Sequence, residues 1–174
     1  KELHHTAYHD HLTGLPNRES LYDHLHLCFY KFPKEKRALL FIDCDNFKLV
    51  NDTMGHSFGD LMIKSVGSRL SELFKKQKMV YRLGGDEFII SYSSFRDLEE
   101  VNACAKNIID CFDVPLEIEG SILHTSVSIG ISIYPDDGVN ADELMKNADI
   151  AMYRAKSFGK NRYVFFSQNM RSEE

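Results

Sequence analysis

The chain has 174 residues, of which 43% are hydrophobic and 27% charged, proportions that fit one ordinary globular domain with its own core. Its formal net charge of −5 excludes a general nucleic-acid binder, because no excess of Lys and Arg is present to neutralise phosphates, although a few placed lysines can hold a small anion. The chain shows no signal peptide and no apolar stretch of the roughly 20 residues that a membrane helix needs, and its four cysteines, without CxxC pairs, are typical of reduced thiols in a cytosolic protein.

The first half of the chain predicts a helix, a strand and a second helix. After a polar, His-rich start and the turn-like segment 13–17, a helix is expected over residues 18–32, ended by Pro33. Residues 38–42 form a continuous apolar run, which predicts a central strand buried on both faces. A helix is expected over residues 59–77, where apolar residues recur at core spacing.

The second half predicts more strands than helices. Residues 79–83 and 88–92 are expected to form a hairpin through Gly84 and Gly85, which permit positive φ. Helices are expected over 97–112 and 141–156, and an edge strand over 163–166. Alternating residues 126–133 predict a half-buried strand, paired with residues 116–122. This order predicts an α+β fold, with helices packed against one mainly antiparallel sheet.

Acidic residues lie where predicted strands end. Asp43 and Asp45 follow the apolar strand, and Asp86 and Glu87 follow the glycine pair of the hairpin. If the hairpin lies beside the first strand, Asp43 and Asp86 meet, and converging carboxylates favour Mg²⁺, which polarises a phosphate and lowers the pKa of an attacking hydroxyl. Either pair alone is better explained by turn formation, since acidic residues are common in turns. The two pairs together favour a metal site.

Several motifs resemble one family. Residues 82–88, RLGGDEF, contain the signature of the GGDEF family, the diguanylate cyclases. Residues 10–18 are similar to the opening DxLTGLPNR element of that family, and residues 41–60 to its nucleotide-binding block. Residues 128–131 and 148–156 are similar to its C-terminal elements, and all of these motifs follow the order and spacing of the family.

The resemblance implies both a fold and a reaction. The expected fold is the palm of nucleotidyl cyclases and polymerases, with a ferredoxin-like, five-stranded central sheet. The expected reaction joins two GTP molecules into cyclic di-GMP and releases two pyrophosphates, with Mg²⁺, or Mn²⁺ in its place, as cofactor. Each domain would hold one GTP, and the 3′-hydroxyl of one GTP would attack the α-phosphate of the other. A homodimer is therefore needed to bring the two nucleotides together.

The resemblance also implies the metal ligands and the base. Asp43 and Asp86 would bind Mg²⁺ with the main-chain carbonyl of Cys44, a position where the family usually has an aliphatic residue. A thiolate ligand is not expected, because thiolates suit softer metals. Asp86, or Glu87 beside it, would help to activate the 3′-hydroxyl. Lys48 would stabilise the charge that develops on the phosphates.

Further matched residues are implied to bind the nucleotide. Asn51 and Asp60 would face the guanine, because an aspartate accepts from its N1–H and exocyclic amine; His56 is as well explained by a structural role. Lys156 and Lys160 would hold the β- and γ-phosphates, although arginine is commoner at the second position and lysine lacks its bidentate fork. The remaining predicted contacts form an anion nest of the backbone N–H groups of Asn46 and Phe47.

Other charged positions have predicted roles outside catalysis. Asp10 and Arg82 are interpreted as a structural pair that fixes the N-terminal element. The His cluster fits a solvated linker better than a transition-metal site; its members are His4, His5, His9 and His11. Many members of the family carry an inhibitory RxxD site, where this chain has Lys75 and Lys78. We therefore predict no inhibition by the product through that site.

Three functions remain open from the sequence. The first is an active cyclase, favoured because all matched metal, base and guanine residues are retained. The second is a catalytically weak GTP-binding regulatory domain that controls an adjacent EAL phosphodiesterase, since residues 128–138 and 165–167 resemble domains of such tandems. The third is a cyclase with another base specificity, which Asn51 and Asp60 argue against. A turnover assay with GTP separates the first two.

The expected domain boundaries follow from the motifs. Residues 1–9 are interpreted as a linker or signalling-helix remnant, 10–168 as the cyclase domain, and 169–174 as the start of a linker to a downstream domain. A sensory domain, an EAL domain or both are expected in the full-length protein. The domain itself is expected in the cytoplasm, and a parent protein anchored at the inner face of the cell membrane is compatible with this location.

Overall fold

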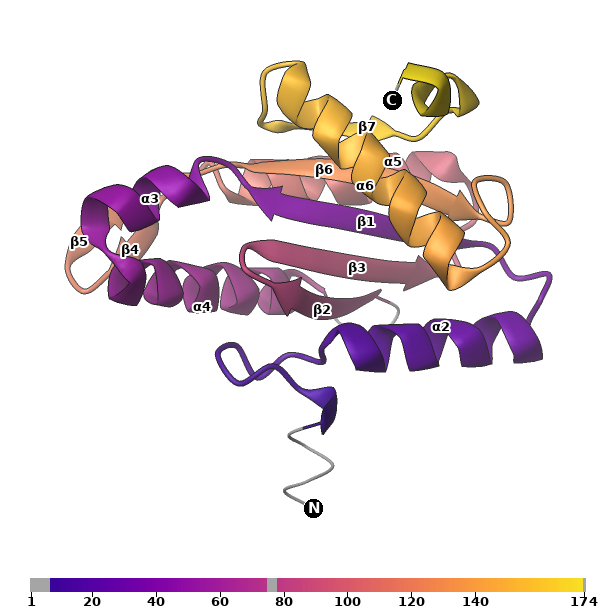
Figure 1. Ribbon diagram of the computed structural model, residues 1–174, viewed down its shortest axis with the longest axis horizontal. Coiled ribbons are helices and arrows are strands. Elements are labelled where there is room, and N and C mark those ends of the chain that lie inside the picture. The colour runs from indigo at the N-terminus through magenta and orange to yellow at the C-terminus, as the bar shows by residue number, and fades with distance from the viewer. Residues whose placement is uncertain (1–6, 75–77, 174) are drawn as a thin grey trace.

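A five-stranded sheet with helices on both faces forms the domain in the computed structural model, which describes residues 7–74 and 78–173 (Figure 1). The strand order is β2-β3-β1-β6-β7. Strands β6 and β7 are parallel to each other, and the other neighbouring pairs are antiparallel. The structure thus confirms the predicted α+β class with a central, mainly antiparallel sheet.

Most predicted elements are present, with bounds that differ by a residue or two. The helices are α2 (Arg18–Lys31), α3 (Phe47–Met54), α4 (His56–Leu73), α5 (Leu98–Cys111), α6 (Ala141–Ser157) and the 3₁₀ helix η1 (Gln168–Glu173). The strands are β1 (Arg37–Cys44), β2 (Lys78–Gly84), β3 (Glu87–Ser93), β4 (Leu116–Ile118), β5 (Ser121–Leu123), β6 (Val127–Tyr134) and β7 (Arg162–Phe165).

Side-chain caps fix the starts of three helices. Asn17, Asp97 and Asn140 each accept a hydrogen bond from the backbone N–H three residues further along, at the starts of α2, α5 and α6. Such a cap satisfies one of the unpaired N–H groups of the first turn and contributes about 1 kcal/mol. Helix α2 ends at Lys31, just before Pro33, as predicted.

The core has two layers, one on each face of the sheet. Helices α4 and α5 cover one face, where they pack on Leu40 and Ile42 of β1. Helices α2 and α6 cover the other face, where they pack on Leu39 and Phe41 of the same strand. Strand β1 is therefore buried on both faces, which confirms the prediction from its continuous apolar run.

Strand β6 corrects the prediction of a half-buried strand. It is buried along its whole length, including its serines and its glycine. Ser132 Oγ donates to the carbonyl of Leu144 in α6 at 2.8 Å. A Cβ at Gly130 would lie 2.0 Å from the carbonyl oxygen of Ala148, so only glycine lets α6 approach this closely. The alternating small residues of β6 therefore form the face that packs against α6, and this face is not exposed to solvent.

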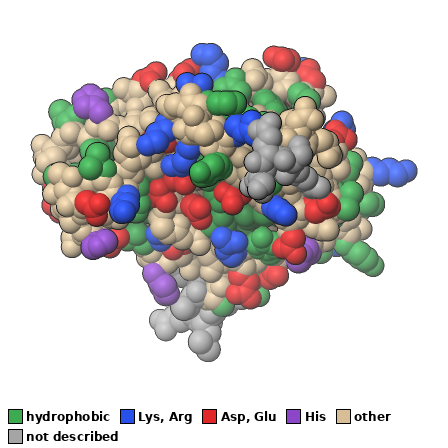
Figure 2. Space-filling model, turned by 45° about the horizontal axis from the view of Figure 1, so that its top comes forward, with side chains coloured by type: hydrophobic (Ala, Val, Ile, Leu, Met, Phe, Trp, Pro, Cys, Tyr) green, Lys and Arg blue, Asp and Glu red, His purple; other side chains and the backbone are tan. Residues whose placement is uncertain are grey.

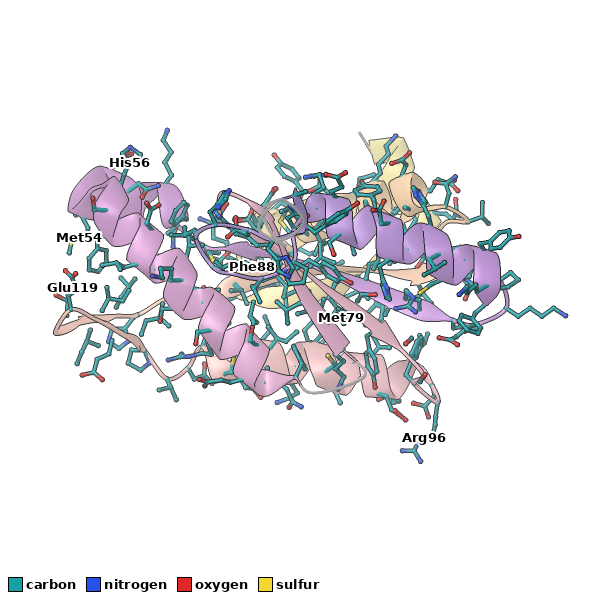
Figure 3. The ribbon with its side chains drawn as sticks, turned by 90° about the horizontal axis from the view of Figure 1, so that it is seen from below. Met54, His56, Met79, Phe88, Arg96 and Glu119 are labelled. Atoms are coloured by element: carbon teal, nitrogen blue, oxygen red, sulfur yellow. The ribbon has the colours of Figure 1, made fainter. Side chains whose placement is uncertain are left out.

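The predicted pairing of residues 116–122 with the strand over 126–133 is wrong. Strand β4 pairs with β5 in a separate two-stranded sheet and not with β6, whose neighbours are β1 and β7. Glu119 and Gly120, both at positive φ, form the tight turn that closes this hairpin. Figure 3 shows Glu119 at the tip, away from the centre of the molecule. Because such a turn closes locally, the segment pairs with itself.

Helices α3 and α4 also differ from the prediction. Helix α3 was not predicted; it is short, has no fully buried residue, and contacts the core through the partly buried Phe47 and Val50. Gly55, at φ 92°, ends α3 and starts α4, which begins at His56, earlier than the predicted residue 59, and ends at Leu73. This helical pair places residues 47–60 beside the end of β1.

Candidate active site

The candidate site lies where β1 ends and β3 begins. Asp43, near the end of β1, is paired with Glu87, the first residue of β3, in the antiparallel register. The backbone N–H of Cys44 donates to the carbonyl of Asp86 at 3.3 Å, which ties the hairpin turn to the end of β1. The hairpin therefore lies beside the first strand, as predicted, and brings Asp43 and Asp86 together.

The paired carboxylates create a local excess of negative charge. Burial, followed by a hydrogen bond to Asp86 and the charge of Asp86, raises the pKa of Asp43 to about 8, against the opposing effect of Lys156. Lys156 Nζ lies 3.4 Å from Asp43 Oδ1, a buried oxygen without a hydrogen-bond partner among the described residues. A hard divalent cation fits these donors, because it prefers oxygen ligands and would supply the missing positive charge.

Cys44 could add to this donor set only through its main chain. Its side chain is 1% exposed and packs in the core beneath α4 and α5. Burial raises the pKa of its thiol well above the ordinary value, which disfavours a thiolate. The carbonyl oxygen is therefore the donor that Cys44 can offer to a hard cation, as the sequence implied.

Asp45 is engaged by the protein rather than available to a metal. Its Oδ1 accepts from Ser128 Oγ at 2.6 Å, and its Oδ2 accepts from Ser126 Oγ at 2.6 Å and from the backbone N–H of Asn161 at 3.0 Å. The acidic pair Asp43 and Asp45 thus offers one ligand and not two. The sequence did not reveal this, because the donors lie 81 to 116 residues away along the chain.

Glu87 lies between the carboxylate pair and a surface cavity of about 310 Å³. Burial raises the pKa of Glu87, with smaller contributions from Asp149 and Asp86, while Arg18 and Lys156 lower it. Sequence analysis missed Arg18 and Asp149 as its neighbours, although both lie inside matched motifs. The cavity lies between α2 and α6 and is lined by Arg18, Tyr22, Phe41, Glu87, Asp142, Met145, Lys146 and Asp149.

The two predicted phosphate lysines lie beside the carboxylates and the start of α3. Lys156 is in the last turn of α6, and Lys160 Nζ donates to Asn46 Oδ1 at 2.8 Å. Asn46 is left-handed (φ 62°, ψ 24°), and its side chain does not cap α3. The first N–H groups of this helix, with Phe47, form the kind of site that binds an anion. Lys48 is exposed in the first turn of the same helix.

Asn51 and Asp60 come from the adjoining helices α3 and α4. Asn51 Oδ1 is buried without a hydrogen-bond partner among the described residues, so this oxygen can accept a hydrogen bond from a ligand. A Cβ at Gly59 would lie 1.9 Å from that oxygen, which places Asn51 directly over the residue before Asp60. Asp60 is exposed. His56 is exposed at the start of α4 and lies, with Met54, at one end of the molecule, whereas Phe88 lies near its centre (Figure 3).

An ion pair connects the N-terminal element to the hairpin. Arg82 Nη1 donates to Asp10 Oδ1 at 2.7 Å, and Arg82 Nη2 donates to the carbonyl of Gly85 at 2.8 Å. Asp10 Oδ2 accepts from both the backbone and the hydroxyl of Thr13. These contacts lower the pKa of Asp10 despite the opposing effect of burial, which is the largest single influence on it. The predicted structural pair is confirmed.

Two further predictions fall partly outside the described residues. His4, His5 and Lys75 lie outside them, so the transition-metal and RxxD interpretations remain predictions. Within residues 7–74 and 78–173, no three side chains of His, Cys, Asp or Glu gather as a metal site. The described cysteines are all free thiols, as expected; they are Cys28, Cys44, Cys104 and Cys111.

The fold and the site together define a class of protein. Paired carboxylates at adjacent strand ends, with lysines beside them and an open helix start, lie on a palm-like α+β sheet. Figure 2 shows acidic side chains gathered on one face of the molecule, with Lys and Arg side chains at their border. This is the architecture of a nucleotidyl cyclase palm domain.

The chain belongs to the GGDEF family. Residues 7–162 match the family described as "Diguanylate cyclase, GGDEF domain". The chain is similar to the GGDEF domain of TpbB (YfiN) from Pseudomonas aeruginosa, with a TM-score of 0.90 and 33% identity over 95% of this chain and 98% of that one. It is also similar to the coiled coil and GGDEF domain of DgcB from Caulobacter crescentus, solved with c-di-GMP, with a TM-score of 0.82, 25% identity and coverage of 94% and 88%.

The curated relatives are longer proteins. The chain is 41% identical to the bifunctional diguanylate cyclase/cyclic di-GMP phosphodiesterase MucR of Pseudomonas aeruginosa, over 98% of this chain and 25% of MucR. It is 39% identical to the signaling protein YkoW of Bacillus subtilis, over 100% of this chain and 22% of YkoW. The chain therefore spans about a quarter of the length of these relatives. No helix among the described residues is long and apolar enough to cross a membrane.

Proposed function

We propose that this domain condenses two GTP molecules into cyclic di-GMP and two pyrophosphates. The observation that carries the proposal is the carboxylate pair, in which a buried oxygen of Asp43 has no hydrogen-bond partner among the described residues and the pKa of Asp43 is raised to about 8 beside Asp86. The single charge of Lys156, 3.4 Å from that oxygen, does not balance both carboxylates. A divalent metal bound together with a triphosphate would supply the missing positive charge.

Asp43, Asp86 and the main-chain carbonyl of Cys44 would hold Mg²⁺, or Mn²⁺ in its place. When bound, the cation would polarise the α-phosphate and lower the pKa of the attacking hydroxyl. Asp86 is the proposed acceptor of the 3′-hydroxyl proton, with Glu87 as the neighbouring candidate. Burial raises the pKa of Glu87, which makes its carboxylate a stronger base than an ordinary glutamate and supports this role.

The remaining side chains would hold the nucleotide. Lys156 and Lys160 would bind the β- and γ-phosphates, and the N–H groups of Asn46 and Phe47 would complete the anion site. Lys48 would stabilise the charge that grows on the phosphates as the bond breaks. This arrangement is supported by the contact of Lys160 with Asn46 at 2.8 Å.

The guanine would lie between α3 and α4. Asp60 would accept from N1–H and the exocyclic amine, donors that adenine does not present in this pattern. The Oδ1 of Asn51, which has no hydrogen-bond partner in the part of the chain that the structure describes, supports its role as a second acceptor for the base. His56 would have at most a peripheral contact with the nucleotide, since its side chain is exposed.

The reaction needs a second copy of the domain. The 3′-oxygen of one GTP forms a bond to the α-phosphorus of the other, the bond to pyrophosphate breaks, and the hydroxyl proton passes to a carboxylate. The same step on the other side closes the ring. A homodimer in which the two sites face each other would supply this geometry.

Turnover of GTP with Mg²⁺ tests the proposal. The wild-type domain, tethered as a dimer, should produce cyclic di-GMP, and Asp86→Asn should abolish it while GTP still binds. Arg96→Ala is a control away from the site, because Arg96 is an exposed surface residue that forms an ion pair with Glu100 and lies at the edge of the molecule (Figure 3). Wild-type protein that binds GTP without forming product would contradict catalysis.

That outcome would favour the alternative, a GTP-binding regulatory domain next to an EAL phosphodiesterase. The curated relatives support such a context, since they include MucR and the cyclic di-GMP phosphodiesterase NbdA of Pseudomonas aeruginosa, 34% identical over 94% of this chain. We propose residues 10–168 as the cyclase unit, with 1–9 and 169–174 as linkers to sensory or EAL domains. The site would face the cytoplasm, where GTP is available, also in a membrane-anchored parent.

A further inference from the structure

Asp45 is a buried carboxylate that joins three segments of the chain. It is 3% exposed and lies just beyond the end of β1. Ser126 and Ser128, from the start of β6, each donate a hydroxyl to it at 2.6 Å. The backbone N–H of Asn161, from the turn between α6 and β7, donates to it at 3.0 Å. All of these contacts use Asp45 as an acceptor, a role that a carboxylate fills on both oxygens.

The turn that Asp45 holds carries one predicted phosphate lysine and follows the other. Lys156 is in the last turn of α6, and Lys160 directly precedes Asn161. Lys160 and Asn161 both have positive φ, 64° and 49°, which is rare for residues other than glycine. Such a conformation persists only where surrounding contacts enforce it. The bond from Asn161 to Asp45 is one of these contacts, together with the bond from Lys160 Nζ to Asn46 Oδ1.

Asp45 also shares the ammonium of Lys156 with Asp43. Lys156 Nζ lies 3.4 Å from Asp43 Oδ1 and 3.8 Å from Asp45 Oδ1. The carboxylate of Asp45 therefore keeps the ammonium of Lys156 between Asp43 and the turn that contains Asn161. Without it, Lys156 would be free to pair with Asp43 alone and would compete with a cation for the same oxygen.

We infer that Asp45 is a positioning residue, which sets Lys156 and Lys160 over the phosphates without touching the nucleotide. The inference rests on the proposed function, because it assigns the lysines to phosphate binding. It also predicts that Asp45 affects the binding of the phosphates, whereas Asn51 and Asp60 affect the binding of the base.

The test is Asp45→Asn, with GTP and guanosine as separate probes. The amide would keep the size of the side chain but present an NH₂ group to donors, which breaks at least one bond. Because the lost bond involves a charged group and holds the lysines in place, GTP affinity should fall roughly tenfold to a hundredfold. Guanosine affinity, followed by NMR shifts, should change less than about twofold, and KM should rise more than kcat falls.

Two other variants make the test decisive. Ser132→Ala removes a buried serine hydrogen bond from the same strand without touching Asp45 and should leave GTP affinity unchanged. If Asp45→Asn does not fold, the double variant Ser126→Ala, Ser128→Ala should reproduce the selective loss of GTP affinity. GTP binding as in wild type, or an equal loss for GTP and guanosine, would overturn the inference. Wild-type protein that binds both probes but makes no product would contradict only the proposed catalysis.

Discussion

At the scale of single residues, Gly59 controls where Asn51 can lie. Any side chain at Gly59 would occupy the position of Asn51 Oδ1, since its Cβ would lie 1.9 Å from that oxygen. The displaced atom belongs to the end of a flexible side chain, so the fold can adapt by moving Asn51. The cost then falls on the proposed base contact rather than on stability.

We therefore expect Gly59→Ala to weaken GTP binding while the melting temperature stays within a few degrees of wild type. An unsatisfied base contact costs about 1–3 kcal/mol, or roughly fivefold to a hundredfold in affinity measured by calorimetry. Gly67→Ala is the control for an added methyl group in the same helix, because its Cβ would contact the side chains of Leu15 and Thr13 at 3.3 Å and not Asn51. Asn51→Ala should add little to Gly59→Ala; additive losses would show that the two residues act separately.

The raised pKa of Asp43 predicts how the metal-free domain responds to pH. Its pKa rises from 3.8 to about 8 on folding, so the folded state holds the proton more tightly than the unfolded chain. This contribution to stability is present below about pH 4 and is lost as the pH rises towards 8. Thermal melts with EDTA should therefore show wild type losing more stability from pH 5 to pH 9 than Asp43→Asn.

Mg²⁺ should reverse this loss at high pH. A ligand at a hundred times its Kd adds about 2.7 kcal/mol, which is roughly 5–10 °C in Tm for a domain of this size. The gain should be larger at pH 9 than at pH 5, where the cation competes with protons, and absent in Asp43→Asn. A gain of the same size in Asp43→Asn would mean that the cation binds elsewhere.

At the scale of elements, the sequence best predicts the helices and strands whose bounds depend on neighbouring residues in the chain. Helix α2 was predictable from its position before Pro33, and β1 from an apolar run that only a doubly covered strand can bury. Asp43 and Asp86 could be predicted as neighbours because the hairpin lies next to β1. Strand β6 was misjudged because Gly130 and its serines have the polarity of a surface but the size that α6 requires. The partners of Asp45 were hidden because tertiary structure alone brings them together.

The close approach of α6 to β6 makes Gly130 a test of this element. A Cβ there would lie 2.0 Å from the Ala148 oxygen and 2.1 Å from the Met152 nitrogen, both backbone atoms that cannot rotate away. Overpacking of this kind costs about 1–3 kcal/mol. We expect Gly130→Ala to lower the urea midpoint and also to weaken GTP binding, because α6 carries Lys156. Unchanged stability would mean that α6 shifts freely on the sheet.

At the scale of the whole molecule, the site is open and incomplete. It lies at the end of one sheet, and under the proposed function each copy would offer one carboxylate pair with one set of phosphate and base contacts. A cyclic product with two phosphodiester bonds needs two such sets facing each other. The relatives carry their GGDEF domain in proteins about four times as long, which leaves room for segments that hold two copies together.

Turnover should therefore depend on how often two domains meet. We expect the specific activity of the untethered domain to rise with protein concentration, and a parallel leucine zipper fused before residue 1 to make activity high and independent of concentration. The reason is proximity: tethering replaces a bimolecular encounter by an effective concentration in the millimolar range for short linkers. A fused monomeric helix of the same length is the control. Equal specific activity at all concentrations, in a domain that sediments as a monomer, would show that one copy suffices and would contradict the two-site mechanism.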